Sequence, residues 1–88
     1  MRLAALSDTQ AKRLRACPPS AKLAYITLAN EGALTQKQLA TETMMPQRTV
    51  RTALEQLIEV GLVTAQSCPY DARKRVYQVT AAGRDPEQ

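Results

Sequence analysis

Apolar side chains return at a helical spacing in the centre of the chain. Between residues 46 and 60 they occupy positions i, i+3, i+4, i+7 and i+8, one face of an α-helix: Val50, Ala53, Leu54, Leu57 and Ile58. Pro46 suits the opening of this helix, where its missing N–H leaves no hydrogen bond unmade, and Gly61 suits the residue just past its end. The pattern predicts an amphipathic helix over about 46–60.

A shorter helical pattern lies immediately before it, over about 36–43. Thr35 and Gln38 have the spacing of a capping box, in which each side chain accepts a hydrogen bond from the other residue's backbone N–H. Met44 and Met45 fall in the turn that follows, where flexible thioethers are expected to fill the core. Two short helices across a three- or four-residue turn predict a helix-turn-helix, whose second helix can lie in a DNA major groove.

A first helix is predicted over about 8–16. Ser7 and Gln10 match a second capping box, and the prolines at 18 and 19 end the helix. Its polar face carries Lys12, Arg13 and Arg15. This face has two interpretations, a solvated flank or an arm that contacts phosphates. A third role for the segment is a dimer contact through Leu3, Leu6 and Leu14.

Another helix is expected to start at a Ser20 cap and to run to about Asn30, with Gly32 as its stop. Its apolar anchors are expected to be Leu23, Ile26 and Leu28. The short apolar pair at 33–34 can add one extended segment before the Thr35 cap.

After Gly61 the pattern changes to that of β-strands. Apolar and β-branched residues at 62–66 and 76–79 flank a turn-rich, basic segment at 68–74. They predict a β-hairpin with a long basic tip, followed by one helical turn over 80–83. A helix-turn-helix followed by a hairpin is a winged helix.

We therefore predict an α+β fold, a winged helix-turn-helix with a three-helix core, a C-terminal β-hairpin wing and an extra short N-terminal helix. The predicted organisation is a basic N-terminal helix with a proline hinge over 1–19, the winged-helix domain over 20–83 and a flexible tail over 84–88.

Composition narrows the function classes. The 88 residues suit one domain, and a net charge of +4 with a pI near 9.4 suits an acidic partner such as nucleic acid. The absence of histidine excludes His-based metal sites and a Ser-His-Asp triad, and two distant cysteines, Cys17 and Cys68, form no zinc motif. We expect no enzyme activity, cofactor or metal site. With neither a membrane-spanning run nor a signal peptide, a cytoplasmic protein is expected.

The distribution of charged residues along the 46–60 helix is unfavourable for the stability of the helix. Arg48 and Arg51 lie near its start, and Glu55 and Glu59 lie toward its end. The helix dipole disfavours each placement by roughly 0.3–1 kcal/mol at exposed sites. Arginines at the start are instead where DNA base edges and phosphates would be met, and arginine–guanine is the commonest specific contact. An Arg51–Glu55 pair would weaken this interpretation.

Three further motifs carry a family resemblance. The chain reads Thr49-Val50-x-x-x-Leu54-x-x-Leu57-x-x-x-Gly61-Leu62-Val63, then Asp71-x-Arg73, then Val79-Thr80-x-x-Gly83. Over about 20–83 this resembles the MarR family of bacterial and archaeal transcriptional regulators. The resemblance implies a prokaryotic regulator that binds double-stranded DNA, with the recognition helix at about 46–60 in the major groove and the wing at about 67–76 on the minor groove.

The resemblance also implies roles for the wing residues. Arg73 would reach the minor groove, whose negative potential attracts a guanidinium, and Asp71 would orient it. Lys74 and Arg75 would then lie near the phosphates.

Polar side chains at the two helix starts complete the predicted site. Gln47 and Thr52 are expected to contact bases or phosphates, while Gln36 and Lys37 are placed to donate to phosphate. Arg48, Arg51 and Thr52 would specify the sequence.

Family members typically dimerise through extended N- and C-terminal helices, and only residues 1–19 correspond to such a segment here. We therefore expect either a homodimer through the N-terminal segment or dependence on a larger partner. Redox sensing by Cys17 or Cys68 is permitted by the resemblance, although a small buried cysteine is the commoner state. The alternative function is a winged-helix protein-interaction module without DNA binding.

Overall fold

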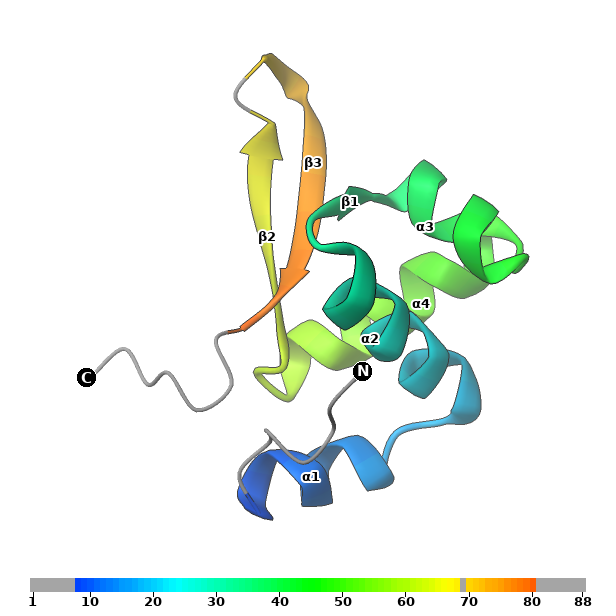
Figure 1. Cartoon of the computed structure of the whole chain (residues 1–88), viewed down its shortest axis with the longest axis vertical. Coiled ribbons are helices and arrows are strands. Elements are labelled where there is room, and N and C mark those ends of the chain that lie inside the picture. Colours follow the sequence, from blue (N-terminus) through cyan, green and yellow to red (C-terminus); the bar gives the residue numbers. More distant parts are fainter. Residues whose placement is uncertain (1–7, 69, 81–88) are drawn as a thin grey trace, which may run out of the picture.

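The computed structural model describes residues 8–68 and 70–80. The elements, in chain order, are α1 (Asp8–Arg15), α2 (Pro19–Glu31), β1 (Leu34–Thr35), α3 (Gln36–Thr43), α4 (Gln47–Glu59), β2 (Val63–Cys68) and β3 (Asp71–Val79). The strands form an antiparallel sheet in the order β1-β3-β2, and the β2–β3 hairpin projects from the helices as a wing (Figure 1). This architecture confirms the predicted α+β winged helix-turn-helix.

The helix-turn-helix begins at the predicted capping box. The Gln38 N–H donates to Thr35 Oγ1 over 3.1 Å, and the Thr35 N–H donates to Gln38 Oε1 over 2.9 Å. Residues 44–46 separate α3 from α4, and Pro46 lies in the cap position, where its carbonyl accepts the Val50 N–H over 3.0 Å. Local sequence signals therefore set the start of both helices.

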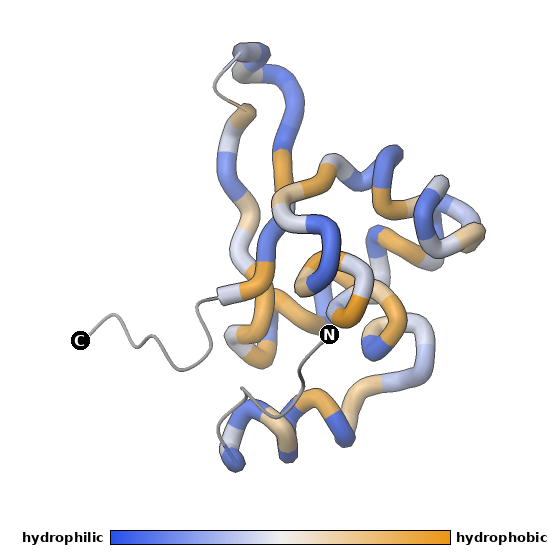
Figure 2. Tube along the Cα trace, in the orientation of Figure 1, coloured by the Kyte–Doolittle hydropathy of each residue, from blue (hydrophilic) through white to orange (hydrophobic). Residues whose placement is uncertain are grey.

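The core is almost entirely aliphatic and lies where the helices meet the base of the sheet. Four of the five predicted apolar positions of α4 are buried, whereas Ile58 is 40% exposed. Tyr25 is the one aromatic side chain among the described core residues, and its burial raises the pKa of the phenol above the ordinary value of 10. Figure 2 shows that the apolar residues concentrate between the helices and that the upper wing is hydrophilic.

Helix α2 differs from the prediction at its cap and in its buried face. Pro18 occupies the cap position and Pro19 opens the helix, so the expected Ser20 cap is wrong. A proline at the first position has a preset φ and no N–H to satisfy, which makes a side-chain cap dispensable. Of the three expected anchors, Leu28 is buried as predicted, whereas Leu23 is exposed and Ile26 is half-buried. The other buried residues of the helix are Ala21, Ala24 and Tyr25.

The wing is longer and its tip shorter than predicted. Strand β2 extends to Cys68 and β3 starts at Asp71, so the predicted turn over 68–74 is wrong. The basic residues 73–75 are part of β3. Pairing between two solvated strands satisfies their backbone groups without the apolar alternation that a half-buried strand requires. The helical turn predicted over 80–83 and the tail over 84–88 fall almost wholly outside the described residues.

Leu14 of α1 is part of the core at 7% exposure and cannot contribute to the predicted dimer contact. Leu3, Leu6 and the expected Ser7 cap lie outside the described residues. No helix within residues 8–68 and 70–80 has the length and apolarity needed to cross a membrane.

Met44 shows the one left-handed backbone among the described residues other than glycine, with φ 60° and ψ 29° at the end of α3. Its side chain is 85% exposed, so the expectation that it fills the core is wrong, whereas the half-buried Met45 packs against the core. This position closes α3 through its N–H, which donates to the carbonyl of Ala40. The conformation is favoured by glycine and disfavoured by residues with a Cβ.

Met44→Gly is expected to raise the free energy of unfolding by roughly 0.5–1 kcal/mol, because relief of the left-handed strain exceeds the extra entropy of the unfolded chain. Urea titration followed by circular dichroism measures the change. Met44→Ala is the matched control, since it removes the exposed side chain but keeps the Cβ. Equal stability of the two variants would contradict the strain argument.

Candidate nucleic-acid interface

The outer face of α4 presents polar side chains at its N-terminal half. Arg48, Arg51 and Thr52 are exposed, and the Thr52 hydroxyl donates to the Arg48 carbonyl over 3.2 Å, which holds the threonine side chain against the helix. Arg51 forms no ion pair with Glu55, because Asp71–Arg73 is the sole ion pair among the described residues. The two arginines of α4 are therefore available to a partner.

Asp71 and Arg73 form a compact unit at the start of β3. The Arg73 N–H donates to Asp71 Oδ1 over 3.0 Å, and the guanidinium Nε donates to the same oxygen over 3.4 Å. The Arg73 side chain is nevertheless 90% exposed, and that of Asp71 is 31% exposed. Because Nε is used in this contact, the terminal nitrogens of the guanidinium remain directed to solvent with a restrained orientation.

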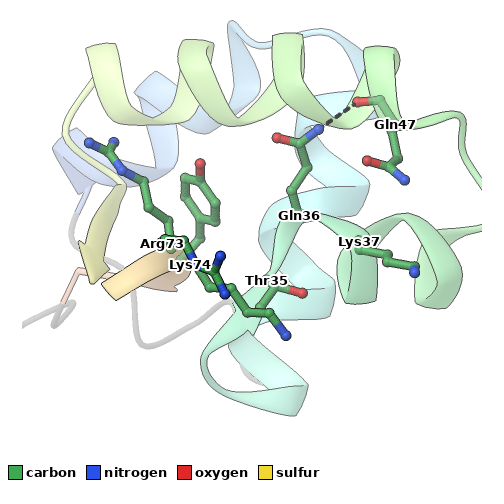
Figure 3. Close-up of a pocket in the computed structure, with 8 residues that line it drawn as sticks. Thr35, Gln36, Lys37, Gln47, Arg73 and Lys74 are labelled. Carbon is green, nitrogen blue, oxygen red and sulfur yellow. Dashed lines mark hydrogen bonds between the residues drawn. The ribbon is translucent and has the colours of Figure 1, made fainter. Parts of the chain in front are cut away.

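A groove of about 390 Å³ separates the wing from the starts of α3 and α4 (Figure 3). Four of its eight lining residues are cationic and none is acidic: Thr35, Gln36, Lys37, Gln47, Arg73, Lys74, Arg75 and Tyr77. On the helix side of the groove, the amide nitrogen of Gln36 donates to the Gln47 carbonyl over 3.4 Å (Figure 3). This bond fixes the first residue of α3 to the first residue of α4. The groove is suited to an extended polyanion.

A smaller hollow of about 170 Å³ continues the groove along α4. It shares Gln36, Arg75 and Tyr77 with the larger groove and adds Arg51, Leu54, Glu55 and Ile58. The structure thus brings seven of the ten predicted site residues to the two hollows. Arg48 and Thr52 are exposed on α4 and line neither hollow. Asp71 lines neither hollow but is hydrogen-bonded to Arg73.

Two tyrosines belong to this surface and were absent from the predicted site. Tyr77 lines both hollows, and its position in a strand-like run gave it only a structural interpretation. Tyr70 is 95% exposed at the tip of the wing. Its signal in the sequence was a large aromatic residue inside a turn segment.

The described residues include no group of three or more histidine, cysteine, aspartate or glutamate side chains that could hold a metal ion. Cys17 is buried and Cys68 is half-buried, and both are free thiols.

A helix-turn-helix beside a hairpin, with a cationic groove between them, defines a winged-helix domain of the kind found in transcriptional regulators. The sequence model of the MarR family matches residues 22–74, which is more than half of the chain. The chain belongs to the MarR family. Members of this family with solved structures are described as transcriptional regulators.

Solved structures of transcriptional regulators show the same fold. A probable transcriptional regulator from Pseudomonas aeruginosa is 27% identical, with a TM-score of 0.74 over 86% of this chain and 58% of that chain. A MarR family transcriptional regulator from Silicibacter pomeroyi is 32% identical, with a TM-score of 0.70 over 83% of this chain and 49% of that chain. A MarR family regulator from Neisseria meningitidis is 30% identical, with a TM-score of 0.63 over 76% and 47%.

This chain therefore spans about half to three fifths of the length of these relatives. No match was found among curated proteins.

Proposed function

We propose that this chain is a sequence-specific DNA-binding transcriptional regulator that acts on double-stranded DNA in the cytoplasm. The observation that carries the proposal is the cationic groove, which joins the exposed Arg73 of the wing to the start of α4. In this arrangement α4 is the recognition helix, and the wing is β2, β3 and the turn between them. The two elements flank the cationic groove of the protein. This spacing would let α4 contact the major groove of DNA while the wing contacts the adjacent minor groove.

The division of labour follows from where each side chain lies. Arg48, Arg51 and Thr52 on the exposed face of α4 enter the major groove, which is about 12 Å wide and admits a helix. The groove-lining cations contact the intervening phosphates and fix the register without reading sequence: Lys37, Lys74 and Arg75. Gln36 and Gln47 supply further donors to phosphate. Arg73 enters the minor groove, with Asp71 holding its Nε.

The scarcity of ion pairs on this surface favours DNA binding over a role as a protein-interaction module. A module that does not bind DNA has no need to leave its arginines unpaired. Among the described residues the single ion pair leaves Arg73 90% exposed, and Arg48 and Arg51 have none. A homodimer through the N-terminal segment over 1–19 is part of the proposal, because two copies would read two half-sites about one helical turn apart.

The test is a two-dimensional amide NMR titration with a mixed-sequence DNA duplex. We expect shifts concentrated in residues 47–52 and 70–76 that fade as the salt concentration rises. Amides that stay unshifted in a folded spectrum would refute DNA binding and direct the search to a protein partner.

Arg73→Ala is expected to weaken binding to all duplexes by a similar factor and to reduce the dependence of log K on log salt by about 0.9, the value for one phosphate-type contact. Fluorescence anisotropy at several salt concentrations measures both quantities.

The Asp71→Ala variant distinguishes the role of Asp71 in orienting Arg73 from the effect of its negative charge. It removes a negative charge and would tighten binding if charge alone mattered, but it weakens binding if Asp71 orients Arg73. Tighter binding by Asp71→Ala would overturn the role of Asp71.

A further inference from the structure

The C-terminal end of α4 lacks a cation of its own. The last carbonyls of a helix have no partner within the helix and carry a partial negative charge. The final turn of α4 contains no basic residue and ends with Glu59, one turn after Glu55. The arginines of α4 lie at its start. At its end, the negative charge of the helix dipole and of the two carboxylates is therefore not balanced by any cation of the helix itself.

Arg13 of α1 supplies this missing cation. Its Nη1 donates to the carbonyl of Val60, the C-cap residue of α4, over 3.0 Å and across 47 positions of sequence. The same nitrogen lies 3.5 Å from the point where a Cβ would stand on Gly61, whose φ is 81°. The guanidinium thus packs against the turn as well as bonding to it. Figure 1 shows α1 beside this turn, where α4 leads into β2.

Helix α1 is itself fixed to the core, so Arg13 is anchored at both ends. Leu14 and Cys17 are buried at 7% and 8% exposure, and the Cys17 thiol donates to the Arg13 carbonyl over 3.4 Å. Lys12 and Arg15 share the helix and the charge, but neither side chain makes a hydrogen bond within the described part of the chain. The contact is specific to Arg13.

The same turn receives a second set of bonds from the end of the wing. Thr80 donates its hydroxyl to the Gly61 carbonyl over 3.1 Å and its N–H to the Leu62 carbonyl over 2.9 Å. Three consecutive carbonyls, those of residues 60, 61 and 62, are thus held by donors from α1 and from the residue after β3. This turn joins α4 to the wing and sets the angle between them.

We infer that Arg13 is a positioning residue for the recognition helix, holding the C-terminal end of α4 at a fixed angle to the wing and coupling α1 to the DNA-reading face. The DNA part of this inference rests on the proposed function. A helix of 13 residues is about 20 Å long, so a tilt of about 10° at its C-terminal end moves the start of α4 by about 3 Å. A shift of that size removes Arg48 from hydrogen-bond distance of a base.

The first measurement is amide hydrogen exchange in the free protein. We expect Arg13→Ala to speed exchange about tenfold at the N–H groups of residues 60, 61 and 62, because local opening of this turn becomes easier. Arg13→Lys, which keeps a donor and the charge, should restore part of the protection. Arg15→Ala removes the same charge from the same helix and should leave the three amides unchanged. A uniform increase across all core amides would indicate general destabilisation and would overturn the inference.

The second measurement compares the affinity for a duplex selected from a random pool with that for a mixed-sequence duplex. We expect Arg13→Ala to lower this ratio about tenfold, the equivalent of one lost base contact, with an unchanged salt dependence. Arg15→Ala should leave the ratio unchanged. An equal loss on both duplexes with a reduced salt slope would make Arg13 a phosphate contact and overturn the inference. If the wild-type protein binds neither duplex, the proposed function fails, while hydrogen exchange still decides whether Arg13 holds α4.

Discussion

Leu57→Ala is expected to lower the free energy of unfolding by about 2–5 kcal/mol, the range for truncating a buried leucine. Leu57 is fully buried on the inner face of α4, so the substitution leaves a cavity beneath the recognition helix. A domain of this size has a total stability on the order of 5–10 kcal/mol. The variant should therefore unfold at a much lower urea concentration, or be largely unfolded at 37 °C, as measured by circular dichroism.

Ile58→Ala is the matched control for this prediction. It removes a side chain of equal size from the next position of the same helix, but Ile58 is 40% exposed and loses less buried area. The expected loss is well below that of Leu57→Ala. Equal losses for the two variants would mean that the two sides of α4 are not buried as differently as the structure describes.

Arg48→Ala is expected to relax sequence preference at one base pair by about 1–3 kcal/mol, while binding to mixed-sequence DNA changes little beyond the loss of one charge. Arg48 is exposed in the first turn of α4, where a bidentate contact to guanine can form. Competition gels with single-base variants of a selected duplex measure the preference.

Arg48→Lys is the control, since it keeps the charge but not the planar pair of donors. It should retain nonspecific affinity and lose most of the preference. If Arg48→Ala and Arg73→Ala both leave binding to every duplex unchanged, the assignment of DNA binding is wrong.

Much of the fold could be predicted because local signals and apolar periodicity agreed. The box formed by Thr35 and Gln38 placed the start of α3 to the residue, and Pro46 and Gly61 bounded α4. Periodicity predicted which face of α4 is buried. Signals of this kind depend on neighbours three or four positions apart, so a sequence displays them directly.

The errors arose where distant contacts decided the outcome. Leu14 appeared available for a dimer, but it is buried in the core once α1 packs onto the rest of the domain. The length of the wing depended on pairing between β2 and β3, which the polar composition of residues 71–75 concealed. Met44 has a left-handed backbone conformation, which a methionine in the sequence does not predict.

The candidate site was predictable as a list of residues but not as a surface. Charge and motif indicated Arg51 and Arg75 separately, yet only the fold brings them to the same hollow, together with Tyr77. Likewise Arg13 looked like a solvated cation, because nothing local links it to a carbonyl 47 positions away.

The short strand β1 has a consequence for how the wing can move. Thr35 pairs with Val76 of β3 and also caps α3, so the lower wing cannot swing away without uncapping a helix of the helix-turn-helix. From Val76 toward the tip, no third strand among the described residues pairs with the hairpin. Bending is thus confined to the upper half, which carries Arg73 and Tyr70. In the proposed complex with DNA, the stiff lower wing would fix the register, and the upper wing would adapt to the width of the minor groove.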